Sequence, residues 1–210
     1  MSTFIECFAC KSANPPDDEM SKSPINLYHE KQRKKLCALH SLNNLLQTAS
    51  FKQEDLDEIC LRLAPGSRFL NPHRALLGLG NYDVNVIMAA LQTKGLEALW
   101  FDQRKDPSCL NLSHIFGFIL NVDNLQGNSS LLSILNPANL FSSKKHWIAF
   151  RKVGDQYYNL DSKLNSPEIV GQENEMIQLL RDKLSSGDCQ VLIVVDKKVA
   201  EDLTCYRPVD

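Results

Sequence analysis

The chain has 210 residues, of which 43% are hydrophobic and 23% are charged, and its formal net charge is −2. This length and composition suit one globular domain with a sizeable core. The charge is close to neutral and no long basic run occurs, which argues against nucleic-acid binding. No apolar stretch is long enough to span a membrane, so no transmembrane segment is expected.

The cysteines and the start of the chain indicate the compartment. Seven cysteines occur, an odd number without regular spacing, which is typical of reduced thiols in an intracellular protein. Residues 1–7 have neither a basic start nor a sustained apolar segment, so no signal peptide is expected. We therefore expect a cytosolic protein, and we expect it to be monomeric.

Residues 1–24 are predicted to form a flexible tail, because they are polar, interrupted by prolines and without apolar periodicity. Within this tail, Cys7 and Cys10 form a CxxC pair. A zinc site would need a second pair of ligands at suitable spacing, and none follows. We therefore expect no metal site here and no cofactor.

The first part of the following domain is predicted to be helical. One helix begins at Cys37, because leucines follow it at helical spacing. A second helix opens near residues 50–53, Ser-Phe-Lys-Gln, which have the spacing of a capping box. A third runs from about Asp83 to Thr93, and Gly95 is suited to end it. An irregular loop is expected over residues 71–81.

After Gly95 the pattern changes to short runs that are rich in β-branched and aromatic residues, which predict strands. These runs cover residues 96–101, 115–122, 147–153, 156–160 and 189–195. A polar loop is expected over residues 123–143, one more helix over residues 173–184, and a loose end over residues 204–210. Strands that cluster instead of alternating with helices predict an α+β fold with an antiparallel sheet.

Cys37 is the first candidate for chemistry. The start of a helix carries partial positive charge, which favours a thiolate over a thiol. Gln32, five residues earlier, could hold an amide N–H beside the same spot. A lone cysteine at this place is equally explained as a small buried hydrophobic residue. The case for Cys37 therefore depends on residues elsewhere in the chain.

The predicted hairpin supplies those residues. A two-residue turn at Gly154-Asp155 would place His146 opposite Lys163 and Asp161 opposite Ile148. His146 and Asp161 would then project from one face as diagonal neighbours, with Cα atoms about 7–8 Å apart. A carboxylate so placed can orient an imidazole ring and stabilise its charged form. Alternatively, His146 is a surface residue and Asp161 ends its strand, and a slip of one residue would separate them.

Together, a cysteine on a helix and a His–Asp pair on a sheet match the layout of a cysteine hydrolase. In this interpretation Cys37 attacks a carbonyl, and His146 takes the thiol proton and then protonates the leaving amine. Asp161 holds the imidazole ring. The Gln32 amide and the backbone N–H of Cys37 bind the oxyanion.

The other four histidines are weaker candidates than His146 for the catalytic base. His40 lies three residues after Cys37 but has no evident carboxylate partner nearby in the sequence. His29 is expected to lie in a loop before the site. His73 and His114 have no local constellation of chemical groups.

At these residues the sequence resembles the Josephin family, deubiquitinating cysteine proteases with a papain-like arrangement. The resemblance rests on Tyr-His-Glu-Lys-Gln at 28–32, Leu-Cys-Ala-Leu-His-Ser-Leu-Asn-Asn-Leu-Leu at 36–46, His-Trp at 146–147 and Tyr-Asn-Leu-Asp-Ser at 158–162. Residues 62–68 and 81–92 narrow it to the short, Josephin-only members. It covers about residues 25–200, with the motifs in the family's order and at similar spacing.

The resemblance implies a papain-like catalytic domain over residues 25–203, with a helical subdomain packed on an antiparallel sheet. It also implies a thiol isopeptidase that acts at the ubiquitin C-terminus, with ubiquitin and ubiquitinated proteins as partners. Carried over to matching positions, Cys37 is the nucleophile, His146 the general base, Asp161 the orienting acid and Gln32 the oxyanion residue. The alternatives are a protease or acyltransferase that uses the same triad, and a weakly active or inactive ubiquitin-binding module.

Overall fold

The computed structural model describes residues 26–33, 35–66, 71–73, 82–123, 145–187 and 189–208. The predicted tail over residues 1–24 with its Cys7/Cys10 pair lies outside the described residues. The same holds for residues 124–143 of the predicted polar loop and for most of the loop predicted over residues 71–81.

The centre of the fold is a six-stranded sheet in the order β1-β6-β2-β3-β4-β5, and each neighbouring pair is antiparallel. The strands are β1 (Leu96–Trp100), β2 (Gly117–Asp123), β3 (Lys145–Val153), β4 (Gln156–Asn159), β5 (Glu168–Gly171) and β6 (Cys189–Asp196). The predicted α+β class with an antiparallel sheet is confirmed. Strand β5 is not among the predicted strands. It is a four-residue edge strand that directly follows the loop-like Asn165-Ser166-Pro167.

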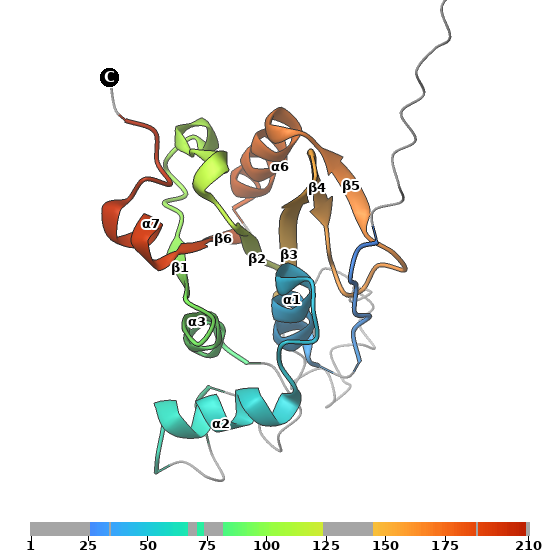
Figure 1. Cartoon of the computed structure of the whole chain (residues 1–210), viewed down its shortest axis with the longest axis vertical. Coiled ribbons are helices and arrows are strands. Elements are labelled where there is room, and N and C mark those ends of the chain that lie inside the picture. Colours follow the sequence, from blue (N-terminus) through green and yellow to red (C-terminus); the bar gives the residue numbers. More distant parts are fainter. Residues whose placement is uncertain are drawn as a thin grey trace, which may run out of the picture.

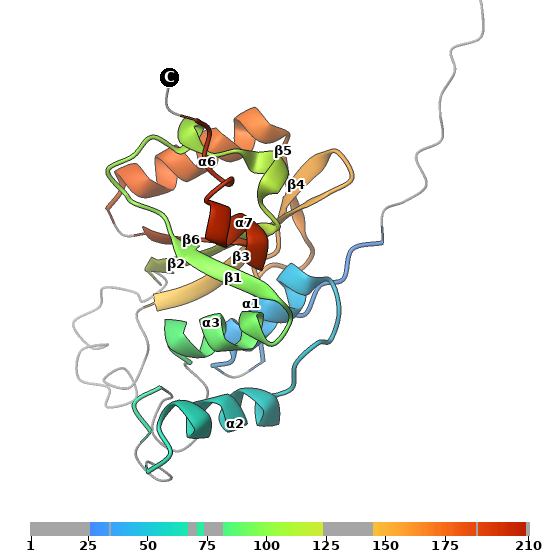
Figure 2. The same ribbon diagram turned by 60° about the vertical axis from the view of Figure 1, so that its left-hand side comes forward.

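Helices cover both faces of this sheet, as Figure 1 shows. They are α1 (Cys37–Leu46), α2 (Gln53–Leu63), α3 (Val84–Gln92), α6 (Glu173–Ser185) and α7 (Lys197–Asp202), with short 3-10 turns η2 (Pro107–Cys109) and η3 (Leu112–His114). In Figure 2, α1 and α3 lie on one side of the sheet, with α2 beyond α3, and α6 lies on the other side. A hydrophobic core lies on each side of the sheet, and alternate residues of β3 pack into one or the other. Trp147 and Ala149 belong to the core on the α1 side, whereas Ile148 and Phe150 belong to the core on the α6 side.

The register of the predicted hairpin is confirmed where the two strands pair. Val153 faces Gln156 across the Gly154-Asp155 turn, and Phe150 faces Asn159. Gly154 adopts a φ of 61°, the left-handed conformation that such a turn favours.

Helix α2 begins later than the predicted capping box over residues 50–53. The amide N–H of Lys52 donates to the Asp55 carboxylate at 2.7 Å, so the capping pair is Lys52 and Asp55. The reason is tertiary. The Asn43 side chain on α1 bonds both the N–H and the C=O of Phe51 at 2.9 Å, which holds Phe51 outside the helix.

The end of the chain also differs from the loose segment expected over residues 204–210. Cys205 is fully buried, and Tyr206 forms an isolated antiparallel bridge with Leu110. The Arg207 N–H donates to the Cys109 carbonyl at 2.8 Å. Residues 205–207 are therefore packed against the segment that carries η2.

Gly117, at the start of β2, sets how closely α1 approaches the sheet. A Cβ at this position would lie 2.6 Å from Leu45 Cδ1 and 2.7 Å from the Phe150 carbonyl oxygen. We expect Gly117→Ala to lower the free energy of unfolding by about 1–3 kcal/mol, because the backbone carbonyl cannot move aside cheaply. Chemical denaturation measures this change. Gly66→Ala is the control, since its Cβ would meet nothing within 4 Å, and equal effects of the two substitutions would contradict the close approach.

Candidate active site

Cys37 is the first residue of α1 and is buried, with 5% of its surface exposed. The preceding residue, Leu36, makes no side-chain cap to the helix. The first N–H groups of a helix have no acceptor within the helix, and the helix dipole adds positive potential there. The sulfur therefore lies beside backbone donors that suit an anion.

His146 and Asp161 meet at the opposite wall of the site. His146 Nε2 lies 2.6 Å from Asp161 Oδ1, and His146 is buried near the start of β3. The residue after it, Trp147, donates its indole N–H to the Tyr82 carbonyl at 3.2 Å, which fixes this end of the strand. Asp161 lies just beyond β4, and its Oδ1 also accepts the Lys163 N–H at 2.9 Å.

The two residues come together differently from the predicted strand pairing. The β3–β4 ladder ends at Phe150 and Asn159, followed by one bond from the Leu160 N–H to the Ala149 carbonyl at 2.9 Å. Asp161 therefore does not pair with Ile148 in the sheet. A turn that begins at Asp161, closed by the Leu164 N–H on the Asp161 carbonyl at 3.0 Å, carries the carboxylate to the imidazole instead.

The electrostatics of the pair favour the charged forms. Burial lowers the pKa of His146, but its contacts with the side chains of Asp161 and Cys37 outweigh burial, so this pKa lies above its usual value. Burial raises the pKa of Asp161, but hydrogen bonds from His146 and the Lys163 N–H outweigh it, so this pKa lies below its usual value. Because Asp161 occupies Nε2, Nδ1 is the ring nitrogen that remains for the Cys37 thiol.

Gln32 is attached to the same turn as Asp161. Its backbone N–H donates to the Ser162 carbonyl at 2.7 Å, and its side-chain Oε1 accepts from the Ser162 hydroxyl at 3.4 Å. The structure thus brings Cys37, His146 and Asp161 together and places Gln32 beside the turn that presents Asp161.

The other histidines have partners that the sequence did not reveal. His40 Nδ1 lies 2.7 Å from Glu30 Oε2, so the expectation that it lacks a carboxylate partner is wrong. His73 likewise pairs with Asp83, the N-cap of α3, at 2.9 Å. In both cases the partner is ten residues away and is brought close by the folded chain.

The last two histidines contact backbone carbonyls. His29 Nε2 donates to the Asp161 carbonyl at 3.0 Å, so His29 lies beside the site as expected. His114 is exposed, and its Nδ1 donates to the Thr204 carbonyl at 2.9 Å.

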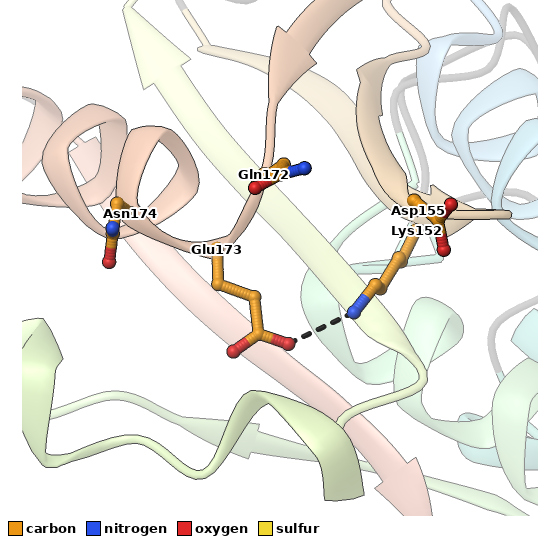
Figure 3. Close-up of a pocket in the computed structure, with 5 residues that line it drawn as sticks. All are labelled: Lys152, Asp155, Gln172, Glu173 and Asn174. Atoms are coloured by element: carbon orange, nitrogen blue, oxygen red, sulfur yellow. Dashed lines mark hydrogen bonds and ion pairs between the residues drawn. The ribbon is translucent and has the colours of Figure 1, made fainter.

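A surface hollow at the β3–β4 turn and the start of α6 is separate from this cluster. Figure 3 shows its lining residues, Lys152, Asp155, Gln172, Glu173 and Asn174. Lys152 and Glu173 form an ion pair across it at 2.9 Å, and exposed pairs of this kind contribute little. Within the ranges that the structure describes, no helix is long and apolar enough to cross a bilayer, and no three His, Cys, Asp or Glu side chains gather as metal ligands.

Comparison with known proteins agrees with the resemblance noted in the sequence. The family model of Josephin matches residues 32–195. The chain is 52% identical to Josephin-2 of Mus musculus over 87% of this chain and 93% of that protein. It is 53% identical to Josephin-2 of Homo sapiens over 85% and 91% of the two chains. It is 46% identical to a Josephin-like protein of Drosophila melanogaster over 83% and 76% of the two chains. The α+β fold, with helices packed on an antiparallel sheet, agrees with what the resemblance implies. The chain therefore belongs to the Josephin family.

Proposed function

We propose that this protein is a thiol-dependent deubiquitinase that hydrolyses peptide and isopeptide bonds at the C-terminus of ubiquitin. Membership of the Josephin family supports a role of the deubiquitinase type. The observation that carries the proposal is the position of His146, whose ring interacts with both the Asp161 carboxylate and the Cys37 side chain. A nucleophile, a base and a group that orients the base are the components of covalent acyl transfer.

In this mechanism the thiol proton of Cys37 moves to His146 Nδ1 first, so the imidazolium is already formed when the sulfur attacks the carbonyl carbon of the last ubiquitin residue. The tetrahedral intermediate collapses when the His146 imidazolium protonates the leaving lysine amine, which leaves a thioester on Cys37. His146 then takes a proton from a water molecule whose oxygen attacks the thioester carbonyl. The carbon–sulfur bond breaks, the His146 imidazolium returns its proton to the Cys37 sulfur, and ubiquitin leaves with a free C-terminal carboxyl group.

Asp161 and Gln32 support these steps without changing covalently. The Asp161 carboxylate stabilises the imidazolium and keeps Nδ1 turned towards the sulfur. The Gln32 side-chain amide and the Cys37 backbone N–H donate to the oxyanion. The attachment of Gln32 to Ser162 supports this assignment, because it ties the oxyanion residue to the turn that presents Asp161.

The proposed setting is the cytosol, with ubiquitin and ubiquitinated proteins as partners of a monomeric enzyme. No disulfide joins the cysteines within the described part of the chain, which supports a reducing compartment.

Ubiquitin that carries an electrophile at its C-terminus tests the proposal. We expect the wild-type protein to form a covalent adduct with one ubiquitin under reducing conditions, and Cys37→Ala to form none, as measured by intact mass. Cys109→Ala is the matched control, because this half-buried thiol lies in η2 and should not affect the adduct. An adduct that persists in Cys37→Ala, or its absence from the wild type, would contradict the proposed nucleophile.

Asp161→Asn tests the orienting role through pH. The carboxylate raises the pKa of His146, so its removal should lower that pKa and let the imidazolium deprotonate earlier as pH rises. The alkaline limb of the kcat/KM profile should therefore move to lower pH, and kcat should fall on the order of 10- to 100-fold while ubiquitin affinity changes little. A profile that superimposes on that of the wild type would exclude this role.

A further inference from the structure

Helix α1 carries a stripe of polar side chains beside its leucines. The stripe consists of His40, Asn43, Asn44 and the C-cap residue Gln47. The first three side chains are buried, and burying polar groups costs free energy unless they are hydrogen-bonded. Each side chain of the stripe bonds the segment of residues 28–33, which carries Gln32.

Two amides of the stripe bind this segment as a neighbouring strand would. Gln47 accepts the N–H of Tyr28 and donates to its carbonyl, both at 3.1 Å. Asn44 accepts the N–H of Glu30 at 2.6 Å and donates to its carbonyl at 3.2 Å. Asn44 also donates to the Leu160 carbonyl at 3.0 Å, next to Asp161. These bonds fix the segment to helix α1, which carries Cys37, at Tyr28 and at Glu30.

His40 also binds this segment, at the residue after Gln32. The Arg33 N–H donates to His40 Nε2 at 3.2 Å. Nε2 must therefore be the unprotonated nitrogen, and Nδ1 carries the proton that it donates to Glu30 Oε2 at 2.7 Å. Glu30 thereby selects the tautomer that can accept the Arg33 N–H.

The Glu30 carboxylate is itself held in place. Its Oε1 accepts hydrogen bonds from the Tyr28 hydroxyl and from Asn43 Nδ2. On the other side of the segment, the turn after β4 supplies two acceptors. The Ser162 carbonyl accepts the Gln32 N–H, and Asn165 Oδ1 accepts from Lys31 Nζ. The Glu30–His40 pair thus holds the segment on both sides of Gln32, at Glu30 and at Arg33. Gln32 itself is bonded to the turn that begins at Asp161.

This arrangement excludes His40 as a second base for Cys37. Glu30 occupies Nδ1 and the Arg33 N–H occupies Nε2, so neither ring nitrogen is left for the thiol. An imidazole paired with a carboxylate, the combination proposed to activate the sulfur at His146 and Asp161, here acts on the backbone.

We infer that Glu30 and His40 are positioning residues that hold Gln32 where its amide can bind the oxyanion. The inference rests on the proposed function and deepens it. It assigns the pair to the step in which the oxyanion forms and not to activation of the Cys37 thiol.

The test separates these two steps in wild type and in His40→Phe, which keeps a ring of similar size and removes both nitrogens. Hydrolysis of ubiquitin joined at its C-terminus to a fluorescent amine passes through an oxyanion, whereas alkylation of Cys37 by iodoacetamide does not. We expect kcat to fall roughly 10- to 100-fold, with KM little changed. The rate of Cys37 alkylation should stay within about twofold of the wild-type rate.

A double-mutant cycle asks whether the effect passes through Gln32. In a Gln32→Ala background, His40→Phe should cause little further loss of kcat, because the group that it positions is already absent. His114→Phe is the matched control and should change neither rate, since this ring is exposed and its Nδ1 donates to the backbone carbonyl of Thr204. If His40→Phe does not fold, Glu30→Gln provides the same test. The NH₂ group of the glutamine cannot accept the hydrogen bonds that the Glu30 carboxylate now accepts from its neighbours.

Three results would overturn the inference while leaving the proposed function intact. These are an unchanged kcat in His40→Phe, a parallel loss of alkylation and kcat, or an effect that adds fully to that of Gln32→Ala. A wild-type protein that turns over no ubiquitin substrate would overturn the proposed function, and the inference with it.

Discussion

The bond between His146 Nε2 and Asp161 Oδ1, at 2.6 Å, is the interaction on which the candidate site depends. It joins the start of β3 to the turn after β4, so it exists only when the hairpin is formed and the turn is closed. Burial of the imidazole works against its charged form, and the contacts with Asp161 and Cys37 reverse that effect. The fold therefore creates both the penalty, at the start of β3, and the group that overcomes it, in the turn after β4.

An imidazole paired with a carboxylate occurs twice near α1, at His146 with Asp161 and at His40 with Glu30. At His146 the carboxylate leaves Nδ1 available for the Cys37 thiol at the start of α1. At His40, one turn further along α1, Glu30 directs the ring nitrogens so that Nε2 accepts a backbone N–H. The first pair suits proton transfer and the second suits placement. The two pairs are linked, because the segment that carries Gln32 lies between α1 and the Asp161 turn.

The sequence predicts those parts of this arrangement that follow from local pattern. Leucine spacing predicts the start of α1 at Cys37, and the turn at residues 154–155 predicts the register of the β3–β4 ladder. The turn that begins at Asp161 and carries its carboxylate to His146 was not predicted. The role of Glu30 could not be found in this way, because its partner His40 becomes its neighbour only when the preceding segment folds back along α1. A signal did exist, since polar residues at helical spacing from His40 to Gln47 interrupt an apolar helix. The start of α2 was wrong for the same reason: Asn43 holds Phe51 through a contact that no local pattern shows.

The contacts of His146, above all its hydrogen bond to Asp161, outweigh burial and raise the pKa of its imidazole above the ordinary value. An NMR titration of the His146 ring nitrogens measures this balance directly. We expect a midpoint above the ordinary value of 6.5 in the wild-type protein and a lower midpoint in Asp161→Asn, where burial is less opposed. A wild-type midpoint at or below 6.5, or one that Asp161→Asn leaves unchanged, would contradict it.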